Sequence, residues 1–263
     1  MMRALYSAAS GMTAQQTTVD NIANNLANAN TAGFKMRRTH FQDLLYQTLS
    51  QPGAAAGNTN TLPVGLQLGL GTRAVSNEII FTQGNFTQTD NPLDVVIQGN
   101  GFFQVRRQDG ELAYTRAGSF KVDRDGNVVT ADGDTLEPQI RIPADAQGIT
   151  IAEDGTVSYT QPGQTATQQA GQIQLATFQN PAGLNSIGRS LYTPTDASGD
   201  AIVGTPGGQE GLGSLLSKYI EQSNVNVVEE FINLIVTQRA YEANSKVVKA
   251  ADDMYSQVNG LTR

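Results

Sequence analysis

The residues whose types and spacing could support chemistry in this sequence are a few acidic turns, a glycine pair and one histidine. The run 123-DRDGNV-128 places carboxylates around a glycine, as a calcium-binding loop does. An EF-hand loop needs its glycine at the sixth position and a glutamate at the twelfth. Here Gly126 is fourth and Asp134 is twelfth, so the run predicts a hairpin turn rather than a calcium site.

Two further patterns are incomplete. The GNG at 99–101 resembles the start of a dinucleotide-binding fingerprint, but Gln104 replaces the third glycine and FFQV follows in place of a helix. His40 is the only histidine and there is no cysteine, which excludes a multi-histidine metal site, disulfides and thiol catalysis. We therefore expect no catalytic residue, no cofactor and no metal site.

The remaining carboxylates are paired in sequence. Glu229/Glu230 and Asp252/Asp253 fall on the outside of an expected helix. General acid–base catalysis needs carboxylates that converge in a cleft, so these pairs are expected to be solvated or to contact other helices.

The charge distribution argues against a nucleic-acid-binding protein. The net charge is −7, with +2 in residues 1–50, −1 in residues 215–263 and −8 between them. Nearly neutral ends suit packing against protein, and an acidic middle suits a solvated surface. No run of about 18 apolar residues exists that could span a membrane as a helix, and the start lacks the apolar block of a secretory signal.

Residues 2 to about 29 are expected to form one helix. Its apolar seam recurs every seven residues at Leu5, Met12, Val19 and Leu26. Its interior also holds four asparagines, namely Asn21, Asn24, Asn25 and Asn28. Each asparagine costs roughly 0.6 kcal/mol relative to alanine, about 2–3 kcal/mol together, so the isolated helix should fray. We expect packing among several copies to stabilise it, because amide side chains can hydrogen-bond to neighbouring helices.

Residues 224–261 are expected to form the second long helix. Heptad positions fall at Ala240, Val247, Met254 and Leu261, and the apolar face is extended upstream by Val227, Phe231, Leu234 and Ile235. Between the ends of the chain, residues 39–49 are predicted to form a short helix. Residues 50–71, rich in Gly, Ala, Asn and Pro, are predicted to form a long loop that is either functional or disordered.

The middle of the chain is expected to be all-β, because β-branched and aromatic stretches alternate with Asp-Gly turns. The fold class is therefore α+β, with a central β domain, a small barrel or sandwich, between coiled-coil-like terminal helices. The expected domains are a discontinuous helical domain (1–35 with 220–263), a connecting region (36–71 and about 190–219) and a β-rich domain (72–190).

Several of these stretches resemble the bacterial flagellar rod and hook proteins. The N-terminal signature of that family is similar to 22-IANNLANANTAGFK-35, and its C-terminal signature is similar to residues 224–254. The middle is similar at 94–105 and 114–126, and residues 41–73 resemble the distal-rod members in particular. The resemblance covers essentially the whole chain.

The resemblance implies a structural subunit rather than an enzyme. Such proteins polymerise into a hollow helical tube, with the terminal helices as its inner wall, that transmits torque from the motor to the hook. The implied partners are copies of itself, proximal rod proteins, the hook protein, a rod cap or muramidase, the P and L rings and the flagellar type III export apparatus, with no nucleic acid and no small-molecule substrate. The implied location is the basal body, from periplasm to outer membrane, after export without a cleaved signal peptide.

Two sets of residues are assigned roles on this basis. The predicted seam, an assembly interface, consists of Leu5, Met12, Val19, Ile22, Asn24, Asn25, Leu26, Asn28, Gly33, Phe34, Phe231, Leu234, Ala240, Tyr241, Val247, Met254 and Val258. The predicted rigidity loop, which would stiffen the tube, consists of Gln51, Pro52, Gly53, Leu62 and Pro63.

Other interpretations remain open at this level. A proximal rod protein is the alternative within the family, and a passive loop is the alternative for residues 50–71. An enzyme with oligomerising helices and a carbohydrate-binding adhesin are the alternatives from other classes. The missing catalytic groups disfavour the first of these, and the long terminal helices disfavour the second.

Overall fold

The computed structural model describes residues 2–52, 64–163, 166–208 and 211–261. The chain divides into two compact units, each built from separate stretches of sequence. Unit 1 comprises Met1–Leu26, Arg37–Glu78 and Asn226–Arg263, and unit 2 comprises Ala27–Met36 and Ile79–Val225. The N-terminal and C-terminal parts of the chain thus contribute to both units.

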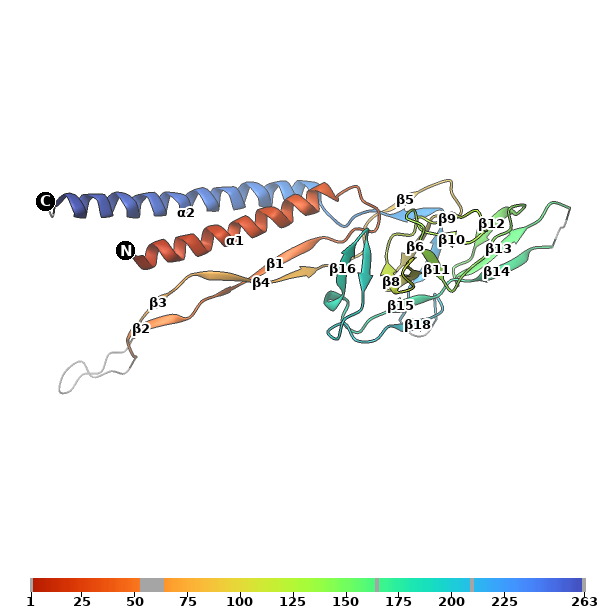
Figure 1. Ribbon diagram of the computed structural model, residues 1–263, viewed down its shortest axis with the longest axis horizontal. Coiled ribbons are helices and arrows are strands. Elements are labelled where there is room, and N and C mark those ends of the chain that lie inside the picture. Colours follow the sequence, from red (N-terminus) through yellow and green to blue (C-terminus); the bar gives the residue numbers. More distant parts are fainter. Residues whose placement is uncertain (1, 53–63, 164–165, 209–210, 262–263) are drawn as a thin grey trace. The chain divides into compact units, whose positions relative to one another are not determined.

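Unit 1 consists of two helices and a long β ribbon (Figure 1). The helices are α1 (Met2–Ala27) and α2 (Val227–Leu261), which confirms the two long helices expected from the sequence. The ribbon strands are β1 (Arg37–Asp43), β2 (Tyr46–Ser50), β3 (Leu66–Gly69) and β4 (Thr72–Ile79), paired β1 with β4 and β2 with β3. No helix in the described part of the chain is long and apolar enough to cross a membrane.

The short helix predicted over residues 39–49 is wrong, because this stretch forms β1 and β2. Phe41, Leu44 and Leu45 have helical spacing, but the stretch is also rich in Thr, Phe and Tyr, which favour strands. Its pairing partners come from later in the chain, and Tyr46 lies opposite Gly69. The predicted loop at 50–71 likewise contains β3, so long-range pairing decided both segments.

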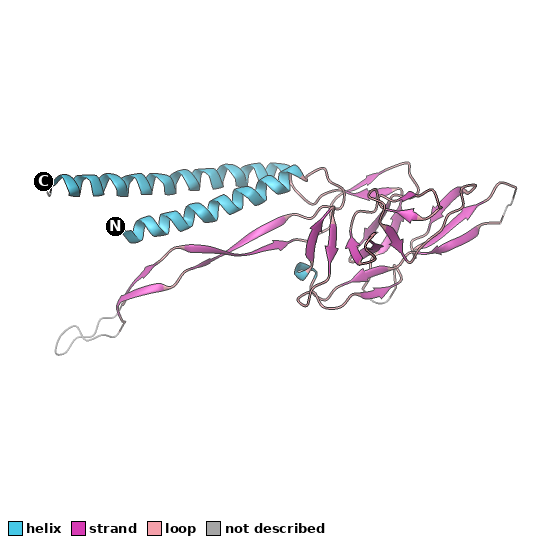
Figure 2. Ribbon diagram, viewed as in Figure 1, coloured by secondary structure: helices cyan, strands magenta, loops and turns pink. Residues whose placement is uncertain are grey.

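The regular secondary structure of unit 2 is almost entirely β, as short strands joined by turns and loops (Figure 2). In chain order they are β5 (Phe86–Gln88), β6 (Val95–Gln98), β7 (Phe102–Arg106), β8 (Leu112–Thr115), β9 (Lys121–Val122), β10 (Val128–Val129), β11 (Thr135–Glu137), β12 (Gln147–Ile151), β13 (Thr156–Thr160), β14 (Gln168–Gln172), β15 (Leu175–Thr177), β16 (Asn185–Gly188), β17 (Leu191–Thr193), β18 (Ile202–Gly204), β19 (Ser214–Ser217) and β20 (Tyr219–Glu221). A single 3-10 turn, η1 (Pro181–Gly183), interrupts them among the described residues.

The main sheet of unit 2 has the strand order β16-β17-β8-β7-β11-β10-β9, with β15 pairing both β7 and β18. A second sheet has the order β12-β13-β14, and two strand pairs, β19 with β6 and β20 with β5, complete the unit. Each pair for which a register is given is antiparallel, as the many Asp-Gly turns predict. The central β-rich domain expected from the sequence is confirmed.

The core of unit 2 forms where the strands turn alternate apolar residues inward. Val95, Phe103, Val105, Leu136 and Leu175 are fully buried in its largest cluster. A smaller cluster is aromatic, with edge-to-face contacts that link Phe81, Phe102, Tyr114, Phe178 and Tyr192. Both clusters lie in unit 2, which therefore has a hydrophobic core of its own.

The expected boundaries of the β domain need correction. Residues 190–219 were expected to connect domains, but they carry β17, β18 and β19, and Leu191 and Leu215 are buried in the core of unit 2. Gly and Ser are frequent in this stretch, and its apolar residues are divided between the core and the surface, where Ile202 and Val203 are exposed. The composition of residues 190–219 therefore did not indicate that this stretch forms strands.

Both turns proposed in place of ligand loops are present. The Gly126 amide donates to Asp123 O at 2.9 Å in the tight turn between β9 and β10, which confirms a hairpin rather than a calcium loop. The GNG at 99–101 joins β6 to β7, with positive φ at Gly99 and Gly101. Such turns favour glycine because other residues are strained at positive φ.

Candidate functional site

Asn25 joins α1 to the β ribbon inside unit 1. Its amide accepts from the Arg37 N–H and donates to the Arg37 carbonyl oxygen, both at 2.9 Å, so it pairs with that residue as a neighbouring strand would. The side chain is buried, and its Nδ2 also lies 3.4 Å from Glu230 Oε2 on α2. One asparagine therefore contacts three elements of the unit.

Two further side chains of α1 hold the ribbon. Asn21 contacts Thr39 and accepts from Asn77 Nδ2 at 2.8 Å. Near the start of the helix, Ser10 Oγ accepts from the Thr72 N–H at 3.3 Å. The asparagine face of α1, expected to meet other copies, is thus in part occupied by the chain's own ribbon.

The helices α1 and α2 approach each other through small and polar residues. A Cβ atom added to Gly11 would lie 2.9 Å from Asn244 Nδ2, so the backbone of α1 comes close to α2 there. On α2 the inward positions Glu230, Thr237, Asn244 and Ala251 recur every seven residues and are buried or half-buried. Close approach, rather than large apolar side chains, defines this helix pair.

Large apolar side chains of unit 1 instead remain exposed. The apolar face of α2 consists of Val228, Phe231, Ile232, Ile235 and Val236, each 48% exposed or more. The ribbon exposes a second set, namely Phe41, Leu45, Tyr46, Leu49, Val64, Leu66, Leu68 and Val75. Contiguous exposed apolar surface of this kind marks protein–protein contact sites.

A groove of about 360 Å³ also opens on unit 1, lined by Gln16 and Val19 of α1 and by Gln238, Tyr241 and Glu242 of α2. Val19 and Tyr241 both belong to the predicted seam. The groove is amphipathic, and its lining includes one carboxylate.

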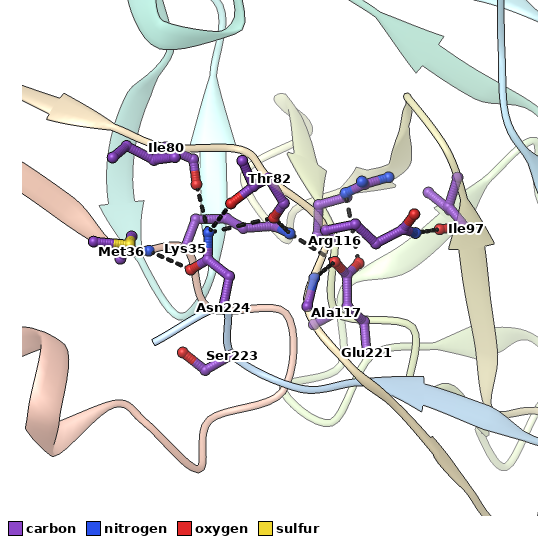
Figure 3. Close-up of polar contacts among 12 residues, drawn as sticks. Lys35, Met36, Ile80, Thr82, Ile97, Arg116, Ala117, Glu221, Ser223 and Asn224 are labelled. Carbon is purple, nitrogen blue, oxygen red and sulfur yellow. Dashed lines mark hydrogen bonds and ion pairs between the residues drawn. The ribbon is translucent and has the colours of Figure 1, made fainter. Parts of the chain in front are cut away.

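Unit 2 contains a buried cluster of charges (Figure 3). Lys35 Nζ lies 2.6 Å from Glu221 Oε1 and donates to the Thr82 carbonyl oxygen at 2.7 Å. Arg116 donates to the carbonyl oxygens of Gly99 and Gly101, and its Nε lies 3.6 Å from Glu221 Oε2. The exposed fractions of the Lys35, Arg116 and Glu221 side chains are 0%, 4% and 1%.

Asn224 and Gly33 complete the surroundings of this charge cluster. The Asn224 side chain accepts from the Met36 N–H and donates to the Ile80 carbonyl oxygen, both at 2.8 Å. The Gly33 N–H donates to the main-chain oxygen of Glu221 at 2.9 Å. The segment that follows α1 and the segment that precedes α2 are thus bonded to each other within unit 2.

Burial lowers the pKa of both cations in this cluster. Removal from water lowers the pKa of Lys35 below its usual value of 10.5, Glu221 opposes that shift, and the Arg116 charge adds to it. The pKa of Arg116 is lowered for the same primary reason. The two cations share one carboxylate, so the cluster carries one excess positive charge when all three groups are ionised.

The residues of the predicted seam differ in how far their side chains are buried. Its buried members are Ile22, Asn25 and Gly33, and its half-buried members are Leu5, Met12, Val19, Leu26, Asn28, Phe34, Leu234 and Ala240. Its exposed members are Asn24, Phe231, Tyr241, Val247 and Met254. The side chain of Val258 lies outside the described residues, as do Gly53, Leu62 and Pro63 of the predicted rigidity loop, whereas Gln51 and Pro52 directly follow β2.

The sequence did not reveal the buried charges, nor Val228, Ile232 and Val236 as members of the apolar face of α2. No local signal in the sequence marks Lys35, Arg116 or Glu221, because the burial of a charged residue depends on which distant segments the fold packs around it. Among the described residues no group of three or more His, Asp or Glu side chains is placed to hold a metal ion.

Comparison with known proteins defines the class. Residues 5–35 match the sequence model of the flagella basal body rod proteins, and residues 216–261 match that of the flagellar basal body rod FlgEFG protein C-terminal region. Residues 96–159 match the flagellar hook protein FlgE/F/G D1 domain. The chain is therefore a protein of the flagellar rod and hook class, with both its helical ends and its β domain represented.

Individual relatives show to which family within this class the chain belongs. The flagellar basal-body rod protein FlgG of Buchnera aphidicola subsp. Acyrthosiphon pisum is 48% identical over 99% of this chain and all of its own length. The FlgG proteins of Borreliella burgdorferi and Bacillus subtilis are 46% and 40% identical, over the full length of both chains in each case. The chain belongs to the FlgG family of flagellar basal-body rod proteins, and it is a structural protein of the rod.

A solved structure, that of the Helicobacter pylori flagellar hook protein FlgE2, also matches, with 14% identity. The match covers 71% of this chain and 43% of that one, with a TM-score of 0.25. A score this low carries no argument about the fold, so the family assignment depends on the sequence relatives.

Proposed function

We propose that this chain is the distal-rod subunit of the flagellum and that it assembles with copies of itself into a hollow helical tube that transmits torque to the hook. The observation that carries the proposal is the exposed apolar face of α2. Burying apolar surface contributes about 25 cal/mol per Å², so five large side chains left in water favour association with another protein.

The terminal helices are proposed to form the inner wall of this tube through coiled-coil-like packing. The heptad spacing of the inward positions of α2 supports this, as does the close approach at Gly11. In this proposal the exposed members of the predicted seam contact neighbouring copies, whereas Ile22, Asn25 and Gly33 position the elements that make those contacts.

The β ribbon is the second proposed contact surface. Its apolar side chains are too widely exposed to stabilise an isolated ribbon, and Leu45 is 85% exposed. The predicted rigidity loop lies in the same stretch of chain. We assign this region the role of stiffening the tube by packing on adjacent subunits.

The proposed neighbours along the axis are proximal rod proteins and the hook protein, with a rod cap or muramidase, the P and L rings and the type III export apparatus as further partners. A relationship to the hook supports part of this, because the hook protein FlgE of Borreliella burgdorferi is 45% identical over 49% of this chain. The proposed location runs from periplasm to outer membrane, after export without a cleaved signal peptide. No catalytic role is proposed, in keeping with relatives that are named as rod proteins.

The test is electron microscopy of concentrated full-length protein and of two matched variants. Ile235→Glu places a charge in the middle of the apolar face of α2 at a residue that is 57% exposed, so the chain itself should still fold. Asn233→Glu adds the same charge to the same helix, at an exposed residue outside that face.

We expect the natural protein and Asn233→Glu to form filaments and Ile235→Glu to remain monomeric with unchanged helix content. Filaments from all three proteins would rule out the apolar face of α2 as the contact surface. If none of them polymerises alone, rod formation in cells that express each variant as the only copy decides between the same outcomes.

A further inference from the structure

The two chain segments nearest the terminal helices meet in unit 2 around buried charges. Lys35 lies eight residues after the end of α1, and Glu221 lies six residues before the start of α2. The two are 186 residues apart in sequence, yet their charged atoms are 2.6 Å apart. Arg116, from the middle of the chain, is the third charged member (Figure 3).

We infer that Lys35, Arg116 and Glu221 form a charge lock, in which the docking of residues 27–36 and the docking of residues 218–225 on the rest of unit 2 each depend on the other. The lock goes beyond self-assembly, since it acts within one chain. It determines whether the two segments that lead to the helices become ordered separately or together.

The first argument is the balance of charge. Glu221 is the one carboxylate within ion-pair distance of both cations in the described part of unit 2. Without the C-terminal segment, Arg116 and a docked Lys35 would be two buried cations with no anion. Because an uncompensated buried charge is strongly destabilising, the N-terminal segment cannot dock stably first.

The second argument is hydrogen bonding. Glu221 Oε1 accepts from both Lys35 Nζ and the Gly84 N–H, and the Glu221 main-chain oxygen accepts from the Gly33 N–H. Asn224 adds a bond from the Met36 N–H. Each segment therefore satisfies buried polar groups of the other, and undocking one leaves those groups unpaired at a cost.

The third argument is that removing Lys35 and removing Glu221 should have unequal effects on stability, which can be measured. Removing Lys35 leaves Arg116 and Glu221, one charge of each sign. Removing Glu221 leaves two buried cations at close range, which repel each other. The lock therefore makes the loss of Glu221 more damaging than the loss of Lys35, and it makes Lys35 harmful once Glu221 is gone.

The experiment uses the full chain with Glu221→Gln, Lys35→Met and the double variant, and it follows hydrogen exchange peptide by peptide. The matched control is Glu137→Gln, which breaks the half-exposed pair between Arg106 and Glu137 on unit 2. We expect Glu221→Gln to speed exchange in residues 27–36 by at least about tenfold, although the substitution lies in the other segment. Lys35→Met should have a smaller effect and Glu137→Gln none.

The double variant decides the outcome. Adding Lys35→Met to Glu221→Gln should restore part of the lost protection, because it removes one of the two unpaired cations. Additive losses, or loss confined to residues near 221, would show that Glu221 acts only as a local hydrogen-bond acceptor and would overturn the lock. If Glu221→Gln does not fold, the double variant must fold for the inference to stand.

Discussion

At the scale of single residues, Gly33 combines a backbone requirement with a packing requirement. Its φ is +69°, in the left-handed region that favours glycine, and a Cβ added there would lie 2.5 Å from the Ala117 backbone nitrogen. Gly33 follows the end of α1, where glycine is favoured for its conformational freedom, and the structure adds the contact with Ala117. The residue is fixed by two independent causes.

Gly33→Ala should therefore destabilise unit 2 by about 1 kcal/mol or more beyond the strain of positive φ alone, which is itself about 1–2 kcal/mol. Gly110→Ala is the matched control, because Gly110 has φ +87° and nothing within 4 Å of an added Cβ. Hydrogen exchange of the β7 amides reports the free energy of opening for each variant. Equal losses would mean that the backbone relaxes away from Ala117.

Asn25 offers a second prediction at this scale, with two opposing effects. Asn25→Ala should raise the helicity of an isolated peptide of residues 2–30, because alanine is favoured by roughly 0.6 kcal/mol. In the full chain the same change removes the side-chain partner of the N–H and carbonyl groups of the half-buried Arg37, which costs up to about 1–3 kcal/mol. Circular dichroism of the peptide and exchange at β1 in the full chain measure the two effects, with the exposed Gln16→Ala as the control for each.

A full-chain Asn25→Ala variant with unchanged exchange at β1 would show that the bonds to Arg37 contribute nothing. Unchanged helicity of the peptide would show that this asparagine does not reduce the stability of the isolated helix. We expect the helicity of the peptide to rise and the protection from exchange at β1 in the full chain to fall.

At the scale of elements, the ribbon is the part of unit 1 that its own helices stabilise least. Its strands expose most of their apolar residues, and its bonds to α1 come from a few side chains such as Ser10, Asn21 and Asn25. A ribbon of this kind gains order from packing on another surface. Its contribution is therefore expected to emerge in the assembled tube rather than in the monomer.

Deletion of residues 50–66 should leave the monomer folded and give a tube that bends more easily. The physical reason is that the contacts proposed between this segment and adjacent subunits would no longer resist sliding of those subunits. Persistence length measured from electron micrographs is the readout. Straight tubes of unchanged stiffness would refute the assigned role of the predicted rigidity loop.

At the scale of the whole molecule, the buried lysine connects stability to pH. Burial lowers the pKa of Lys35 below 10.5, so over the interval between the lowered value and 10.5 the unfolded chain holds a proton that the folded chain has released. Stability rises with pH wherever the unfolded state binds more protons. The free energy of unfolding should therefore gain a contribution from Lys35 as pH increases through that interval.

Lys35→Met should lack this contribution. The stability of the natural protein relative to the variant should rise as pH increases toward 10.5, and the effects of other titrating groups cancel in that difference. Denaturant unfolding over this range measures it. Parallel pH profiles would mean that Lys35 keeps its proton in the folded chain.

The sequence by itself determined the two long helices, the β-rich middle and the family. Each has a local or regular signal: heptad spacing at the ends, β-branched runs with Asp-Gly turns in the middle, and the quoted signatures. The same local signals failed at residues 39–49, where Phe41, Leu44 and Leu45 have helical spacing but pairing with later strands, such as that of Tyr46 with Gly69, decides the conformation.

Only the tertiary structure decided which faces are buried and which charges meet. Asn25 bonds to Arg37 within the same chain, whereas Phe231 and Ile235 are exposed. Lys35 pairs with Glu221, which lies 186 residues away in the sequence. Secondary structure depends largely on neighbours in sequence, whereas burial and pairing depend on which distant segments the fold brings together. The residues near a position in sequence do not show which distant segments will pack against it.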